Sequence, residues 1–278
     1  MSINTSLQQK GLDFRQLHET GIFVMPCAWD AMSALLFERV GYAAIATTSG
    51  GVNWGHGRPD YVYGVPRDEM LASYGQIAAA IQLPLSGDLE NGYGDDPSAA
   101  AECILQAIEH GMVGGSIEDH AADDLTAMLP VEAAVEKIAA AREAADSSGL
   151  TFTITGRAES MYFDVANPLD DAIERSNQYA AAGADCIFIP GLTDIETIAS
   201  TAANVDAPLS IGIGTGGSNY TVAELADAGV RRISTGGAVP RAIYSSIDSI
   251  AREMLDGTFT FMSDIMPDTD VESLFVAS

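Results

Sequence analysis

The sequence Ser86-Gly-Asp-Leu-Glu-Asn-Gly-Tyr-Gly94 follows an apolar run, residues 81–85, and places two carboxylates and a glycine turn after it. The apolar run predicts a buried strand. Asp88 and Glu90 are two residues apart, so in an extended segment they project from the same face, toward the carboxyl end of that strand. A second acidic pair, Glu118-Asp119, ends the next strand-like run, residues 112–117. Three or four carboxylates are therefore expected to converge at one end of a parallel sheet.

Carboxylates gathered in this way repel one another unless a cation lies between them. Oxygen ligands that leave room for water suit Mg²⁺ or Mn²⁺ better than Zn²⁺. The acidic residues therefore predict a magnesium or manganese site. The alternative is that they are ordinary acidic turn residues at strand ends, with no metal.

The rest of the chain alternates strand-like and helix-like segments. Apolar runs occur at residues 21–25, 43–47, 83–88, 113–118, 151–155, 185–189, 209–213 and 231–235. Amphipathic segments occur at residues 31–40, 67–80, 97–110, 130–147, 168–182, 194–203 and 221–228. Several have start signals, such as Asp96-Pro97, Asn167-Pro168 and Thr193-Asp194, and several end at glycine, as helices do. This order predicts an α/β fold, a (β/α)8 barrel formed as a single domain over residues 1–278.

An open doubly wound sheet is the alternative fold, but the chain lacks the glycine-rich fingerprint of dinucleotide-binding sheets. In a barrel, the active site occupies the carboxyl ends of the strands. Asp88, Glu90, Glu118 and Arg157 all fall there. Two further segments, residues 240–256 and 263–277, follow the eighth strand. One helix completes the barrel, so the second segment is expected to pack elsewhere, such as on a neighbouring subunit.

Composition limits the partners. The chain has 13 basic and 39 acidic residues, a net charge of −26, which argues against nucleic acid and anionic membranes. No run approaches the roughly 20 apolar residues of a membrane span, and the first ten residues lack the apolar core of a signal peptide. Cys27, Cys103 and Cys186 are isolated and apolar in context, which predicts buried thiols in a reducing compartment. A cytoplasmic protein is expected.

Six motifs occur in order at successive predicted strand ends. They are Trp29-Asp-Ala31, Thr47-Thr-Ser-Gly-Gly51, Gly57-Arg-Pro-Asp60, Asp88-Leu-Glu-Asn-Gly-Tyr-Gly94, Ile117-Glu-Asp119 and Gly156-Arg-Ala-Glu159. In these motifs the chain resembles the isocitrate lyase/phosphoenolpyruvate mutase superfamily, in the branch with oxaloacetate decarboxylases, phosphonopyruvate hydrolases and 2-methylisocitrate lyases. The resemblance covers nearly the whole chain. It implies a homotetramer of barrels in which the C-terminal helical segment, residues 240–278, is swapped between subunits.

The resemblance also implies a metal-binding arrangement. Asp88 would approach Mg²⁺ directly, and Glu90 and Glu118 would hold its coordinated waters. Relatives bind a 2-oxo or 2-hydroxy carboxylate on this metal, which polarises the 2-oxo group and stabilises the enolate left when the neighbouring bond breaks.

Substrate-binding residues follow by position. Thr48, Ser49 and Gly50 would donate hydrogen bonds to the substrate carboxylate, with Asp60 near its metal-bound end. Arg157 would supply a charge-assisted contact to the same anion.

Arg157, Glu118 and Asp60 are the predicted catalytic residues. For Arg157 the alternative is a structural salt bridge to Glu118 or Glu159.

The loop after the fourth strand departs from its relatives. Lyases of the superfamily carry a cysteine there, and the mutases and phosphonopyruvate hydrolases carry lysine and asparagine. Here residues 120–130 contain none of these, and Asp123-Asp124 would repel a phosphonate. His120 is a possible acid or base in this loop, or a histidine that faces water.

These departures favour metal-assisted cleavage of a carbon–carbon bond in a small 2-oxo or 2-hydroxy dicarboxylate, with oxaloacetate-type decarboxylation first. A retro-aldol lyase acting on a substituted malate or (methyl)isocitrate is second, and phosphonopyruvate chemistry third. A non-catalytic 2-oxo acid binding protein is the alternative outside enzymes. Specificity is expected to reside in residues 119–130 and 190–192.

Overall fold

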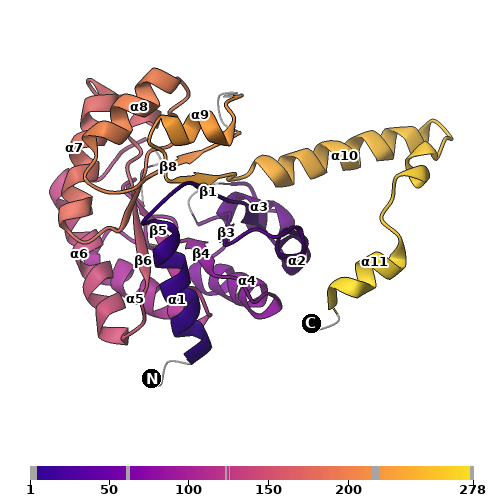
Figure 1. Ribbon diagram of the computed structural model, residues 1–278, viewed down its shortest axis with the longest axis horizontal. Coiled ribbons are helices and arrows are strands. Elements are labelled where there is room, and N and C mark those ends of the chain that lie inside the picture. Colours follow the sequence, from indigo (N-terminus) through magenta and orange to yellow (C-terminus); the bar gives the residue numbers. More distant parts are fainter. Residues whose placement is uncertain (1–4, 61–62, 123, 125, 215–218, 276–278) are drawn as a thin grey trace.

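The structure, a computed structural model, describes residues 5–60, 63–122, 124, 126–214 and 219–275. Within these residues, the strands form one parallel sheet that curls into a ring (Figure 1). In chain order they are β1 (Phe23–Met25), β2 (Cys27–Ala28), β3 (Ile45–Thr47), β4 (Leu85–Asp88), β5 (Gly114–Glu118), β6 (Thr153–Arg157), β7 (Cys186–Phe188), β8 (Leu209–Gly212) and β9 (Arg232–Ser234). The predicted α/β barrel is confirmed.

The nine strand labels correspond to eight barrel strands. Only Pro26 separates β1 from β2, and proline has no N–H to donate to a neighbouring strand. β1 pairs with β9, in the register Phe23 opposite Arg232, whereas β2 pairs with β3. The two segments are therefore halves of one strand that closes the ring.

Helices surround the ring and follow the strands as the sequence predicts. They are α2 (Ala31–Val40), α4 (Arg67–Ala80), α5 (Pro97–Glu109), α6 (Val131–Ser148), α7 (Pro168–Ala181), α8 (Ile195–Asn204) and α9 (Val222–Asp227). Local chemistry sets several ends. Asp30 forms a capping box with Ser33, and α2 ends at Gly41 in the left-handed conformation.

Two helices were not anticipated. α1 (Thr5–Leu17) lies at the amino-terminal end of the ring, where Arg15 contacts Phe152 and Asp185 and Phe14 is fully buried. α3 (Ser49–Gly55) is a short glycine-rich helix that begins directly after β3. Its amino-terminal residues belong to the predicted strand-end motif Thr47-Thr-Ser-Gly-Gly51.

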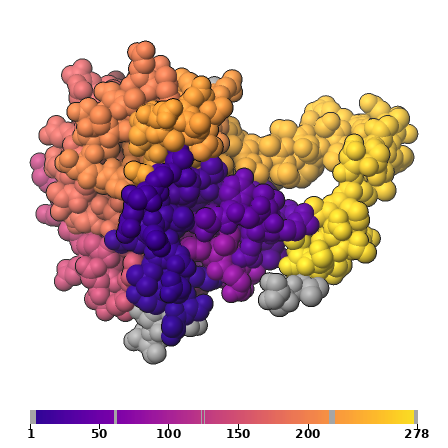
Figure 2. All heavy atoms as spheres, viewed as in Figure 1, coloured from indigo at the N-terminus to yellow at the C-terminus, as the bar shows by residue number. Residues whose placement is uncertain are grey.

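The carboxyl-terminal region leaves the barrel. α10 (Ala238–Leu255) projects away from the ring, and η2 (Thr260–Ser263), α11 (Asp268–Glu272) and η3 (Ser273–Phe275) return toward α2, which η3 contacts (Figures 1 and 2). Pro240 is the one buried residue of α10. The long helix that projects from the barrel is thus α10, whereas the described part of the predicted element 263–277 includes only the short helices α11 and η3 and the end of η2. Residues 276–277 lie outside the described residues.

Large apolar side chains are exposed along this region. They are Ile243, Ile247, Met254, Leu255, Phe259, Met262, Ile265, Met266 and Phe275. The three cysteines are buried and free, as predicted. No helix in the described part of the chain is long and apolar enough to cross a membrane.

Candidate active site

A cavity of about 570 Å³ opens at the carboxyl ends of the strands. Its lining includes residues from β3, β4, β5, β6 and β9 and from the loops that follow them. All of the predicted metal-binding residues line it, as do Ser49, Asp60 and Arg157. The barrel therefore brings together the side chains that the motifs had placed at separate strand ends.

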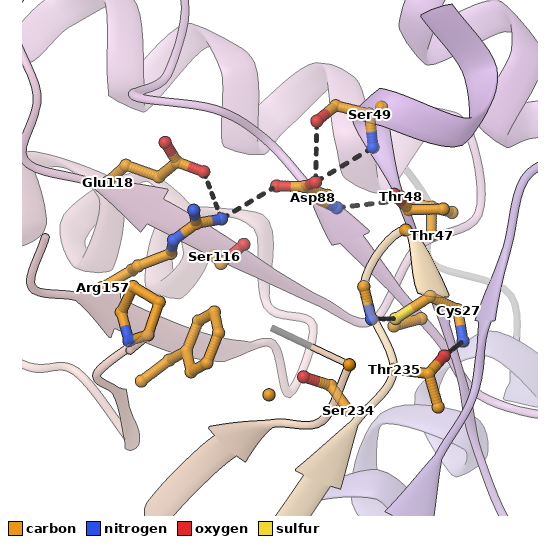
Figure 3. Close-up of a pocket in the computed structure, with 18 of the residues that line it drawn as sticks. Cys27, Thr47, Thr48, Ser49, Asp88, Ser116, Glu118, Arg157, Ser234 and Thr235 are labelled. Atoms are coloured by element: carbon orange, nitrogen blue, oxygen red, sulfur yellow. Dashed lines mark hydrogen bonds and ion pairs between the residues drawn. The ribbon is translucent and has the colours of Figure 1, made fainter. Parts of the chain in front are cut away.

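Asp88 is the last residue of β4 and is held from several sides. Its backbone N–H donates to Thr47 Oγ1 at 2.9 Å, and its carbonyl oxygen accepts from the Tyr74 hydroxyl at 2.9 Å. Its Oδ2 accepts from both the backbone N–H and the hydroxyl of Ser49, at 2.9 and 2.8 Å (Figure 3). Its Oδ1 is buried and has no hydrogen-bond partner among the described residues. One oxygen of Asp88 is thus fixed, and the other is available to a ligand.

Glu90 reaches the cavity through an unusual backbone conformation. Its φ is +51°, in the left-handed region that costs a non-glycine residue about 1–3 kcal/mol and that is enriched at functional sites. Its carbonyl oxygen accepts from the Glu118 N–H at 2.9 Å, which ties the turn to β5. Gly92 follows with a φ of +83°, where a Cβ would lie 2.9 Å from Ala100 Cα. Lys137 Nζ, buried on α6, donates to the Gly94 carbonyl at 2.5 Å.

The two adjacent acidic residues at the end of β5, Glu118 and Asp119, point in opposite directions. Glu118 faces the cavity, and its Oε1 lies 2.5 Å from Arg157 Nη1. Asp119 points the other way, toward α7, where it accepts from the Tyr179 hydroxyl at 2.6 Å and pairs with Arg175 at 3.3 Å. The expectation that Asp119 adds a fourth carboxylate to the site is therefore wrong. Successive side chains of a strand point to opposite faces, so only Glu118 of this pair can reach the cavity.

His120 lies on the same side as Glu118 and does not face water. Its side chain is buried, its Nδ1 is 2.8 Å from Glu118 Oε2, and it lines the cavity. The following loop is fixed to the barrel, because Leu129 N–H donates to the Asp119 carbonyl and His120 bridges to Met128. Asp124 is exposed and accepts from Thr126, so it does not line the cavity; Asp123 lies outside the described residues.

Arg157, at the end of β6, is the central cation of the site. Its Nη1 lies between Glu118 and Asp88, with Asp88 Oδ1 at 3.9 Å (Figure 3), and its Nε contacts Glu159. The guanidinium also stacks over the Phe188 ring, 5.2 Å from the centroid. The salt-bridge alternative for Arg157 is therefore present in this structure, since both Glu118 and Glu159 pair with it.

The predicted substrate-binding residues lie on the β3 side of the cavity. Thr48 caps α3, and Ser49 donates to Asp88 in this structure. Gly50 lies against Asp60, because a Cβ at Gly50 would be 2.6 Å from Asp60 Oδ2. Only glycine fits there without displacing Asp60. The role of these residues toward a substrate stays a prediction.

The electrostatics show an excess of negative charge. Burial, followed by the Glu118 charge, raises the pKa values of Asp88 and Glu90. Burial also raises the pKa of Glu159 to about 7, although Arg157 opposes this shift. Burial alone would raise the pKa of Glu118, but Arg157 and His120 outweigh it and lower that pKa. A bound cation would relieve this repulsion.

The donor set fits a divalent metal. One ligand atom from each of Glu90, Glu118 and His120 lies within 4.8 Å of the others, and all three residues are buried. Asp88 Oδ1 and His120 Nε2 are buried without hydrogen-bond partners among the described residues. Both residues line the cavity, so both atoms are available to a bound cation or to water.

Sequence reasoning missed some residues of the cavity. Glu159 is predicted only as an alternative salt-bridge partner of Arg157; it pairs with Arg157 and also lines the cavity. Phe188, at the end of β7, and the buried Arg232, on β9, also line the cavity. The position of Phe188 at the end of a predicted strand is the one sequence feature that could have placed it in the cavity. Nothing in the local sequence indicates that Arg232 lines the cavity.

Comparison with known proteins identifies the family. The model of the phosphoenolpyruvate phosphomutase family matches residues 14–255. An uncharacterized protein of Mycobacterium tuberculosis (strain H37Rv) is 31% identical over 247 residues, which cover 88% of this chain and 90% of that protein. The 2-methylisocitrate lyase of Shewanella oneidensis is 30% identical over 210 residues, which cover 73% of this chain and 70% of the lyase.

A solved structure from Burkholderia cenocepacia J2315 shares the whole fold. It has 41% sequence identity and a TM-score of 0.93, and the match covers 98% of each chain. Relatives with named activities are lyases and mutases, so the chain is an enzyme of this kind. The chain belongs to the phosphoenolpyruvate phosphomutase family, within the isocitrate lyase/phosphoenolpyruvate mutase superfamily.

Proposed function

We propose that this enzyme cleaves a carbon–carbon bond in a small 2-oxo or 2-hydroxy dicarboxylate with the help of a divalent cation, Mg²⁺ or Mn²⁺. Decarboxylation of oxaloacetate or a related 2-oxo diacid is the first candidate. The observation that supports this best is the convergence of Asp88, Glu90 and Glu118 on one cavity, where Asp88 Oδ1 has no hydrogen-bond partner among the described residues. A cavity rich in carboxylates binds an anionic substrate only when cations offset their charge.

Asp88, Glu90 and Glu118 would hold the cation, Asp88 directly and the two glutamates at least partly through water. Bound there, the cation polarises the substrate's 2-oxo group and neutralises the negative charge that develops as the neighbouring bond breaks. Ser49 fixes the orientation of Asp88 through its two hydrogen bonds.

Arg157 would bind the substrate carboxylate. Its planar guanidinium offers several donors in a fixed geometry that suits a carboxylate. Its present partners, Glu118 and Glu159, hold it at the cavity wall, and stacking on Phe188 restricts its orientation. The substrate would therefore meet an arginine that is already positioned, which lowers the entropy cost of binding.

The loop 120–130 supports decarboxylation over the alternatives. Decarboxylation of a 2-oxo diacid leaves an enolate product, so a dedicated protein acid is less necessary than in a lyase that must protonate a carbanion. The loop holds no cysteine for that role and no lysine or asparagine for a phosphoryl group. The argument from repulsion by Asp123-Asp124 is weaker, because Asp124 does not line the cavity.

A retro-aldol lyase is the second candidate. The named 2-methylisocitrate lyases among the relatives favour it, and a cavity of about 570 Å³ leaves room for a substituted malate. The two chemistries share the cation and Arg157 and differ in the bond that breaks.

A substrate panel tests the proposal. The purified enzyme is assayed with Mg²⁺ or Mn²⁺ on oxaloacetate, a 2-alkylmalate, isocitrate, 2-methylisocitrate and phosphonopyruvate, and pyruvate, glyoxylate and CO₂ are monitored. We expect turnover of oxaloacetate that exceeds the metal-catalysed background and disappears with a chelator. Heat-denatured enzyme with the same metal is the control, because free metal ions also decarboxylate oxaloacetate. Turnover of phosphonopyruvate or 2-methylisocitrate with inert oxaloacetate would contradict the assignment.

We also propose a homotetramer in which the C-terminal segment packs on a neighbouring subunit. The apolar side chains exposed along α10 and beyond it support this arrangement, since exposed apolar surface of this extent marks an interface.

A further inference from the structure

Asn91, in the turn after β4, is fully buried and does not line the cavity. Its side-chain amide uses all four of its hydrogen-bonding positions. Oδ1 accepts from the Gly94 N–H at 3.2 Å and from the Tyr63 hydroxyl. Nδ2 donates to Asp95 Oδ1 at 3.2 Å and to the His120 carbonyl oxygen at 3.1 Å. No donor or acceptor of this amide is left for a ligand.

These partners allow one orientation of the amide. Rotating it by 180° would turn the NH₂ group toward the Gly94 N–H and the oxygen toward two oxygen acceptors, those of Asp95 and His120. A buried amide whose four positions are matched in this way holds its neighbours in one arrangement.

The hydrogen bonds of Asn91 join separate parts of the chain. His120 lies just beyond β5, 29 residues away, and Tyr63 lies 28 residues away, before α4. Asp95 extends the connection, because its Oδ1 also accepts from the Ala122 N–H at 2.8 Å. The turn after β4 is therefore tied to the segment that follows β5.

Glu90, the residue before Asn91, has the backbone conformation that needs such support. Its φ of +51° lies in the left-handed region, which persists in a residue other than glycine only where the surroundings hold it. On one side the Glu90 carbonyl oxygen accepts from the Glu118 N–H at 2.9 Å. On the other side the Asn91 amide fixes the next residue to His120. Without the amide, one of these two restraints is lost.

We propose that Asn91 is a positioning residue for the metal site, which holds Glu90 so that its carboxylate reaches the water molecules of a cation bound at Asp88. This inference rests on the metal-dependent function proposed above. It names a residue that acts on the site without touching the cation or the substrate. Residues that orient the groups around a metal in this way typically contribute about tenfold to hundredfold to metal affinity.

A double-mutant cycle with Glu90 tests the proposal, with Mn²⁺ affinity measured by calorimetry in the absence of substrate. Asn91→Ala removes the whole amide. Asn91→Ser is the milder variant, because its hydroxyl can remain bonded within the turn but is too short to reach His120. We expect each to lower Mn²⁺ affinity by roughly tenfold or more. In a Glu90→Gln background, where the carboxylate is already absent, the same substitutions should change affinity by no more than about twofold.

Asn177→Ala is the matched control. The Asn177 amide on α7 also joins separate segments, since it donates to the Asn204 carbonyl oxygen at 2.9 Å and accepts from the Asp206 N–H at 2.8 Å. It does not line the cavity. Its removal should leave Mn²⁺ affinity unchanged, whatever its effect on the free energy of unfolding.

The outcomes separate this inference from the proposed function. Equal losses of affinity in the two backgrounds would show that Asn91 does not act through Glu90 and would overturn the inference, as would unchanged affinity in Asn91→Ser. Either result leaves the metal-dependent function standing, because the unmodified protein still binds the ion. Failure of the unmodified protein to bind Mn²⁺ would overturn both.

Discussion

Acid should destabilise this protein through His18, which lies beneath the cavity at the end of α1. Its Nδ1–H donates to the Phe14 carbonyl at 2.9 Å, and its Nε2 faces Arg232 Nη1 at 3.2 Å. Both nitrogens are thus satisfied only when the ring is neutral. Burial, with the Arg232 charge as the next cause, lowers the pKa of His18 to about 3.

The sign and size of the effect follow from linkage. The unfolded chain binds a proton on His18 below its free pKa of 6.5, whereas the folded protein does not until the pH approaches about 3. The unfolded state therefore binds more protons in this window, and the free energy of unfolding falls as the pH falls. Between pH 7.5 and pH 5.0 the contribution of this one residue amounts to about 2 kcal/mol.

Urea unfolding at several pH values between 7.5 and 5.0, at one protein concentration, measures this contribution. Carboxylates also titrate toward the acid end, so the quantity of interest is the difference between the unmodified protein and His18→Gln, which cannot gain the proton. Between pH 7.5 and 5.0 we expect the free energy of unfolding of His18→Gln to fall by about 2 kcal/mol less than that of the unmodified protein. A constant difference in stability between the two proteins does not affect this comparison. His56→Gln, at an exposed site, is the control. Parallel pH profiles for the unmodified protein and His18→Gln would refute the reasoning.

Three further predictions concern the site and the assembly. Asp88→Ala should abolish metal-dependent binding of oxalate, a mimic of the pyruvate enolate, and unchanged calorimetric affinity would contradict the metal assignment. Arg157→Lys keeps the charge but loses the planar fork, so kcat/KM should fall by the equivalent of roughly 1–3 kcal/mol, and an unchanged value would argue against carboxylate binding by Arg157. Deletion of residues 263–278 and the substitution Ile247→Glu on α10 should each give smaller or aggregated species by light scattering. The control Val222→Glu on α9 should assemble normally. Unchanged assembly in both the deletion variant and Ile247→Glu would argue against a swapped segment.

Much of the fold could be predicted because its signals are local. The bounds of α2 and α4 match the predicted segments, and for α2 the end signals Asp30 and Gly41 lie directly beside the helix. α1 and α3 were missed for different reasons. α1 has a polar sequence whose role depends on distant partners such as Phe152, and α3 consists largely of residues with weak helix preference.

The site could be predicted in part. Strand-end position was enough to gather Asp88, Glu118 and Arg157, because a barrel brings the ends of all its strands to one side. Strand-end position alone does not predict that Asp119 points away from the cavity, because that direction depends on the alternation of side chains along β5. Nor could it reveal the left-handed backbone of Glu90, which depends on the contacts of the whole turn.

The closure of the ring at Pro26 has a consequence for synthesis of the chain. The first strand can pair with β9 only after the last strand has left the ribosome, and contacts such as Gly236 N–H to Cys27 Sγ span 209 residues. At about 5–20 residues per second, the growing chain therefore carries an unpaired edge for roughly 10–40 seconds. A short strand interrupted by proline is a poor template for pairing with other chains. The break at Pro26 thus makes this edge less able to pair with another chain before β9 is available.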